Sequence, residues 1–162
     1  MLKSAVCGWS YRMGAKHIAA EMQKIGVDAV HFAACPFVDP KAIVPGTCGE
    51  TENVDGTGGA ESLEEQREFI AEQVSTGRWK IVSTLFNSRY DDYSTIESIR
   101  RTGGLMNDEH WLENREILKA AARQTAQWKC PFMLLHAGYL EAGNDASERK
   151  FRDRIATARY LR

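Results

Sequence analysis

The sequence predicts an α/β fold built on a parallel sheet. Short apolar segments alternate with amphipathic segments four times along the 162 residues. The strand-like segments are nearly continuous apolar runs, which is typical of parallel strands covered on both faces. Glycines or capping residues stand at several of the helix boundaries. This alternation fits either an open doubly wound sheet or a barrel, and the pattern alone does not choose between them.

The first unit and the strand of the second unit precede a long loop. Residues 4–7 and 27–33 are the predicted strands. Between them, over residues 18–25, apolar side chains recur at i, i+4 and i+7, which is one face of an amphipathic helix. Gly26 stands where a glycine commonly ends a helix. Residues 34–61 are rich in proline and glycine, and we expect a long loop there.

The helix of the second unit has a clear start. Ser62 and Glu65 have the spacing of a capping box, in which each side chain satisfies a backbone N–H of the first turn. Gly77 is expected to end this helix. Residues 80–86 contain several β-branched side chains and predict the third strand. A short helix is expected over residues 93–101.

The main helix of the third unit is longer, and it precedes the strand of the fourth unit. Asn107 or Asp108 is expected to cap it, since both residue types favour the position before the first turn. Residues 131–136 are the fourth predicted strand. Asn144 or Asp145 then opens the last predicted helix.

We expect one partial domain over residues 1–162. A complete barrel of this architecture has about 250 residues, and closure needs about eight strands. The last helical pattern continues to the final residues without a glycine or proline. We therefore expect this chain to be a natural truncation, a split gene product or a fragment.

The composition is that of an ordinary soluble protein, with 43% hydrophobic and 27% charged residues. The formal net charge of −1 offers no basic field for a phosphate backbone, so nucleic acid is disfavoured as a partner. The sequence shows no apolar run of about 18 to 20 residues, so no membrane span is expected. The four cysteines are scattered without a CxxC pair, which indicates reduced thiols in a cytoplasmic protein.

His136 is the sharpest candidate for chemistry, because ligands of parallel α/β folds bind at the carboxyl ends of the strands. It follows the fourth predicted strand. A neutral imidazole there suits a divalent metal or a hydrogen bond to a substrate hydroxyl. The alternative is a core histidine whose ring nitrogens are satisfied by the backbone.

Five further residues are expected substrate contacts, at or near the ends of the four strands: Trp9, His31, Phe86, Arg89 and Tyr139. Arg89 has the geometry to hold a phosphate or carboxylate through two parallel hydrogen bonds. Alternatively, Arg89 is a solvated loop residue that forms an ion pair with a neighbour such as Asp91 or Asp92. Trp9, together with Tyr93, offers an apolar platform for a sugar ring, although aromatic residues more often pack in a core. His31 lies inside its strand and points either into a barrel or against a helix.

Two segments carry a family resemblance. Residues 92–104 (Asp-Tyr-Ser-Thr-Ile-Glu-Ser-Ile-Arg-Arg-Thr-Gly-Gly) and residues 135–138 (Leu-His-Ala-Gly) resemble the sugar phosphate isomerase/epimerase group. That group belongs to the xylose isomerase-like barrels, which also include endonuclease IV. The resemblance covers residues 2–161 and implies a TIM barrel of which about four β/α units are present here, so that the barrel is incomplete.

The resemblance implies a metal-dependent isomerase or epimerase that moves a proton next to the carbonyl of a sugar or sugar phosphate. A divalent metal (Mn, Mg, Co or Zn) is expected for the full-length family. His136 is then a catalytic residue and a metal ligand, and the remaining ligands are expected beyond residue 162. We therefore expect this chain alone to be inactive. Whether it binds a metal by itself stays open.

Two other functions fit the same sequence. A non-catalytic half-barrel would form a homodimer through its open sheet edges and shield its apolar faces. A DNA-repair enzyme similar to endonuclease IV is the third reading, and the near-neutral charge argues against it.

Overall fold

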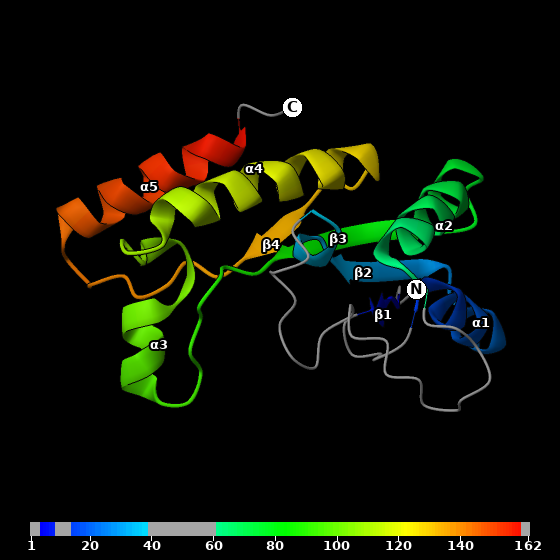
Figure 1. Cartoon of the computed structure of the whole chain (residues 1–162), viewed down its shortest axis with the longest axis horizontal. Coiled ribbons are helices and arrows are strands. Elements are labelled where there is room, and N and C mark those ends of the chain that lie inside the picture. The colour runs from blue at the N-terminus through cyan, green and yellow to red at the C-terminus, as the bar shows by residue number, and fades with distance from the viewer. Residues whose placement is uncertain (1–3, 9–13, 39–60, 160–162) are drawn as a thin grey trace.

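The computed structural model describes residues 4–8, 14–38 and 61–159. Within them, four parallel strands form one sheet in the order of the chain (Figure 1). An open doubly wound sheet reverses its strand order at a switch point, and the described sheet has no such reversal. The predicted α/β fold is confirmed, and the strand order is that of a barrel. The strands are β1 (Val6–Cys7), β2 (Ala29–Ala33), β3 (Lys80–Phe86) and β4 (Met133–Leu135).

Helices lie between and after these strands, as the alternating pattern predicts. In Figure 1, α4 and α5 lie side by side, and α1 and α2 form a second pair near the other edge of the sheet. The described part of the chain contains α1 (Ala15–Ile25), α2 (Leu63–Ser75), α3 (Ile96–Thr102), α4 (Trp111–Gln127) and α5 (Asp145–Arg159), with 3-10 turns η2 (Cys35–Phe37) and η4 (Gly104–Met106).

Local capping fixes several of these boundaries where the sequence predicts them. The Ser62 hydroxyl accepts a hydrogen bond from the Glu65 N–H at 3.2 Å, and the Glu65 carboxylate accepts one from the Ser62 N–H at 2.7 Å. The predicted capping box is therefore confirmed. Gly26 follows α1 with a φ of 68°, a left-handed conformation that glycine adopts without steric cost. Asn144 accepts from two N–H groups in the first turn of α5.

The start of α4 differs from the expectation. The residue before its first turn is His110, three or two positions later than Asn107 or Asp108. The Asn107 side-chain amide accepts from the Glu109 N–H through Oδ1 and donates to the Thr102 carbonyl through Nδ2, and the Asp108 carboxylate is paired with Arg154 of α5. Tertiary contacts therefore use the two side chains that the sequence offers as caps. Likewise, α3 begins after Thr95, whose hydroxyl caps it, rather than at residue 93.

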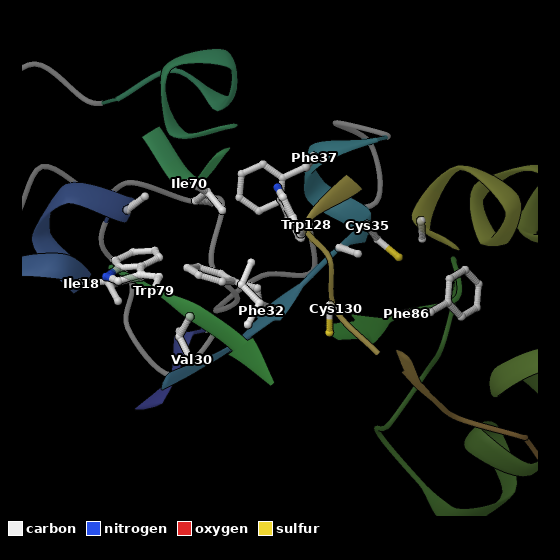
Figure 2. Packing of buried hydrophobic residues seen from close by; sticks show 14 of the residues in the cluster. Ile18, Val30, Phe32, Cys35, Phe37, Ile70, Trp79, Phe86, Trp128 and Cys130 are labelled. Carbon is white, nitrogen blue, oxygen red and sulfur yellow. The ribbon is translucent and has the colours of Figure 1, made fainter. Parts of the chain in front are cut away.

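The hydrophobic core lies between the sheet and the helices, with Phe32 of β2 at its centre (Figure 2). The Phe32 ring stacks on Trp79 with 5.7 Å between centroids and contacts Phe37 and Trp128 at 6.4 and 6.2 Å. These rings come from β2, from η2 and from the residues just before β3 and after α4. The core thus fixes the strands whose carboxyl ends carry the candidate site.

Part of the predicted architecture lies outside the described residues. The expected loop over 34–61 is described at its two ends, where residues 35–37 form η2 and residue 61 precedes the capping box. No helix among the described residues is long and apolar enough to cross a membrane.

Candidate functional site

His136 lies directly after β4, at the carboxyl end of the parallel sheet where the sequence predicts it. Its side chain is 46% exposed, which does not fit the alternative of a core histidine. The His136 carbonyl accepts a hydrogen bond from the Leu105 N–H at 3.2 Å. The backbone is therefore held while the imidazole faces outward from the strand end.

A carboxylate faces the imidazole. Asp91 Oδ2, in the loop after β3, lies 3.9 Å from His136 Nδ1. The other oxygen, Oδ1, accepts from the Ser88 hydroxyl at 2.7 Å and from the Gly104 N–H at 3.0 Å. Because Oδ1 is held on both sides, the carboxylate has a defined orientation and Oδ2 is turned toward His136.

Tyr93 adds an aromatic surface and a hydroxyl to this pair. Its ring is stacked with the His136 ring at 6.2 Å between centroids, and its hydroxyl donates to Asp91 Oδ2 at 3.3 Å. Burial raises the pKa of the Tyr93 phenol above its ordinary value, and the Asp91 charge and the hydrogen bond to it act in the same direction. The phenol is therefore protonated at neutral pH and serves as a hydrogen-bond donor.

Two glycines allow the segment after α3 to touch the segment after β4. Gly104 has a φ of +67°, and a Cβ atom added there would lie 2.5 Å from the Gly138 nitrogen. Gly138 also has a positive φ, of +92°. Between them, the Met106 N–H donates to the Ala137 carbonyl at 3.2 Å. This close backbone contact fixes His136 relative to the Asp91 loop.

Tyr139 lies at the same edge, three residues after His136. It is half-exposed, and the Arg100 guanidinium carbon lies 5.3 Å from the centre of its ring. Arg100 comes from the last turn of α3, whereas Tyr139 belongs to the segment after β4. The contact therefore joins α3 to the segment that contains His136.

Other predicted contacts lie elsewhere. Phe86 is 1% exposed and packs in the core, so we leave it out of the candidate site. The Arg89 guanidinium is ion-paired with Glu113 of α4, and the Arg89 N–H donates to Asn114 Oδ1 at 2.7 Å. Arg89 therefore ties the loop to α4 instead of facing His136. Trp9 lies outside the described residues.

His31 is placed deeper in the sheet. Its Nδ1 contacts the Ser83 hydroxyl, and the register aligns both with Cys7 in one row across β1, β2 and β3. His31 alternates with the core residues Val30 and Phe32, so it faces the other side of the sheet from the helices. Burial lowers the pKa of the imidazole. His31 thus lies within the strand, apart from the group around His136.

The structure therefore brings together five side chains: Asp91, Tyr93, Arg100, His136 and Tyr139. Sequence reasoning found His136 and Tyr139 by their position after a strand. From sequence, Asp91 is expected as part of a charged loop and Tyr93 as an apolar platform, and no sequence feature indicates Arg100. An arginine in the last turn of a helix is common because it complements the helix dipole, so it carries no signal of a site.

The metal expected from the resemblance was compared with these donors. Among the residues that the structure describes, no group of three or more His, Cys, Asp or Glu side chains is placed to hold a metal ion. Asp91 and His136 supply two candidate ligands. The described side chains therefore do not fit a metal site by themselves.

The comparisons with known proteins bear on the fold. No family model matches the chain, and no curated protein matches it. A solved structure, the xylose isomerase domain protein from Planctomyces limnophilus, superimposes with a TM-score of 0.61 over 88% of this chain. The fold is therefore that of a partial TIM barrel. At 15% sequence identity the match shows the fold alone, and the chain covers 45% of that protein.

Proposed function

We propose that this chain supplies the first four β/α units of an isomerase or epimerase that acts on a sugar or sugar phosphate. The observation that carries the proposal is the group formed by Asp91, Tyr93 and His136 at the carboxyl ends of β3 and β4. In barrel enzymes this end of the sheet holds the catalytic residues. The xylose isomerase-like fold supports the same class of reaction.

The three side chains suit a polyhydroxylated ligand. The exposed imidazole of His136 can donate a hydrogen bond to a hydroxyl or accept one from it. Asp91 holds the imidazole in one orientation from the side of Nδ1, which leaves Nε2 as the atom that meets the ligand. The Tyr93 ring provides an apolar surface beside it. We propose that His136 transfers a proton next to the substrate carbonyl.

The divalent metal of the full-length family stays a prediction. Because the described side chains do not provide a ligand set, no step of the proposed reaction is assigned to a metal. In a metal-bound form, His136 would contribute one ligand through Nε2 in place of the proton transfer, and the other ligands would come from outside the described residues.

Binding to the full chain tests this proposal. Fructose and fructose 6-phosphate would be titrated into the protein while the imidazole resonances are followed by NMR. We expect the His136 signals to shift, and we expect His136→Gln to weaken binding. His17→Gln is a matched control, because His17 on α1 is also 46% exposed but lies outside the site. Equal binding by the His136 variant and the control would rule out the assigned site.

A second measurement concerns catalysis by the chain alone. In deuterated water with added Mn²⁺, an active site exchanges the carbon-bound hydrogen next to the sugar carbonyl. We expect no exchange with this chain, as predicted from the sequence. Steady exchange that depends on His136 would show that the chain alone is active.

An alternative function is a non-catalytic half-barrel that forms a homodimer. It is favoured by two large apolar side chains at the β4 edge, since Phe132 is 69% exposed and Leu134 is 57% exposed. A second copy that packs on this edge would cover them. Light scattering would give the mass of a dimer, and substitution of Leu134 by Lys would reduce it to that of a monomer. A monomer in the unsubstituted protein would contradict this alternative.

A further inference from the structure

We infer that Arg100 and Tyr139 form a subsite for an anionic group, a phosphate or a carboxylate, on the ligand that His136 binds. The inference rests on the proposed function and extends it to the part of the ligand that lies away from the reacting carbon. It assigns to Arg100 the role that the sequence suggests for Arg89.

Arg89 and Arg100 differ in whether a carboxylate of the protein compensates their charge. Arg89 is paired with the Glu113 carboxylate, so its charge is already compensated within the protein. Among the described residues, none of the ion pairs to a carboxylate involves Arg100. Arg100 is also exposed, whereas Arg89 is partly buried. An incoming anion would therefore meet an uncompensated positive charge at Arg100 and a neutralised one at Arg89.

The Arg100 guanidinium lies over the aromatic ring of Tyr139. Its carbon lies 5.3 Å from the centre of the Tyr139 ring. A cation over an aromatic face is attracted by the ring, and a guanidinium carries its five N–H donors in a rigid planar fork. Such a fork matches the geometry of a phosphate or carboxylate, which accepts two parallel hydrogen bonds. The contact with Tyr139 thus limits the motion of Arg100.

Arg100 and Tyr139 both lie close to His136 along the chain or in space. Arg100 is followed after one further turn by Gly103, the residue that ends α3. A Cβ atom added to Gly103 would lie 3.2 Å from His136 Cε1, so the end of α3 touches the imidazole. Tyr139 approaches from the other direction, three residues after His136. The helix and the strand end therefore place the subsite next to the hydroxyl-binding group.

The ligand class follows from this arrangement. One end of the ligand carries hydroxyl groups that hydrogen-bond with His136, and the other end carries an anion that pairs with Arg100. Glucose 6-phosphate and glucuronate have this chemistry with different anions on the same carbon, and glucose is their uncharged counterpart. The three compounds separate the sugar, the phosphate and the carboxylate.

The test is calorimetric titration of the full chain with these three sugars and with inorganic phosphate. We expect at least one anionic sugar to bind more tightly than glucose, and Arg100→Gln to lower that affinity about tenfold, which corresponds to about 1.4 kcal/mol. Glucose binding should not change. Arg101→Gln is the matched control, because Arg101 is the next residue of the same helix and interacts with Asp92. It should lower the affinity less than twofold, and Arg89→Gln should also leave anion binding unchanged.

The outcomes separate the subsite from the proposed function. Equal effects of the Arg100 and Arg101 variants, or equal affinity for glucose and both anionic sugars, would overturn the subsite and leave the proposed function standing. Binding of inorganic phosphate that depends on Arg100, without binding of any sugar, would support an anion site and contradict the proposed function. If none of the four probes binds, both are wrong.

Discussion

His136 Nδ1 faces Asp91 Oδ2 across 3.9 Å, and this pair joins the loop after β3 to the end of β4. Asp91 is held from its other oxygen by Ser88 and Gly104. The carboxylate therefore has a fixed position from which it orients the imidazole. Orientation of a histidine by a second-layer carboxylate determines which ring nitrogen carries the proton.

Asp91→Asn is expected to change the tautomer of His136. The asparagine oxygen can still accept from Ser88 and Gly104, and its amide NH₂ would then replace Oδ2. An amide N–H facing Nδ1 favours the imidazole with its proton on Nε2, whereas a carboxylate favours the proton on Nδ1. Long-range ¹H–¹⁵N correlation spectra distinguish the two forms. An unchanged tautomer ratio would show that Asp91 does not orient His136.

The same substitution should lower the pKa of Tyr93. The phenol pKa is raised above its usual value of about 10 by burial and then by the negative charge of Asp91. Removing that charge makes the phenolate less unfavourable. The measurement is the ¹³Cζ shift of Tyr93 against pH. Asp92→Asn is the control, since the interactions of Asp92 are with Ser94, Ser98 and Arg101, and it should leave the Tyr93 titration in place.

The raised pKa of Tyr93 also has a consequence for stability. The folded state binds the phenol proton more tightly than the unfolded state does. This contribution is fully present below the unfolded pKa of about 10 and is lost as the pH rises through the higher folded value. Urea unfolding of wild type and Tyr93→Phe should therefore diverge above pH 10. Parallel stability curves across that range would contradict the assignment.

Gly104→Ala is expected to disturb the site more than Gly77→Ala. Both glycines have a positive φ, of 67° and 72°, so both variants carry similar backbone strain. A Cβ atom at Gly104 would run into the backbone of residues 136–138, while one at Gly77 meets nothing within 4 Å. The free energy of unfolding should fall by at least about 1 kcal/mol more for the first variant. His136 resonances should move in that variant alone, and equal losses in the two variants would argue against the close contact.

A buried hydroxyl pair links β3 to α4. The Thr84 and Thr125 hydroxyls are 2.7 Å apart, and Thr125 also donates to the Ala121 carbonyl. Thr125→Val leaves the Thr84 hydroxyl without that partner, at a cost of about 1 to 3 kcal/mol. The double variant T84V/T125V should recover part of this loss, because it removes both hydroxyls. Urea denaturation of the single and double variants measures the coupling, and additive losses would contradict it.

The elements of the fold were predictable where they depend on local sequence. Residues 80–86 were expected as a strand and form β3, and the Ser62 capping box begins α2. The start of α4 was not predictable, because Asn107 and Asp108 are occupied by contacts with other segments. Local propensity cannot weigh a cap against an ion pair to a helix some 45 residues away.

The site was predictable in part for the same reason. The position of His136 after an apolar strand is a local feature, and it places the residue at the ligand-binding edge. The choice between Arg89 and Arg100 depends on where Glu113 and Tyr139 lie in space. Phe86 was expected at the ligand, but a strand-end residue faces either side of the sheet, and this one faces the core.

The chain order of the strands has a consequence for how the protein is made. Each described strand pairs with the strand that precedes or follows it in sequence. A ribosome delivers the chain from the N-terminus, and segments fold as they emerge. The edge of β2 is in place before β3 is synthesised, and the edge of β3 before β4. The sheet can therefore grow by one unit at a time during translation, with no described strand waiting for a partner more than one unit ahead.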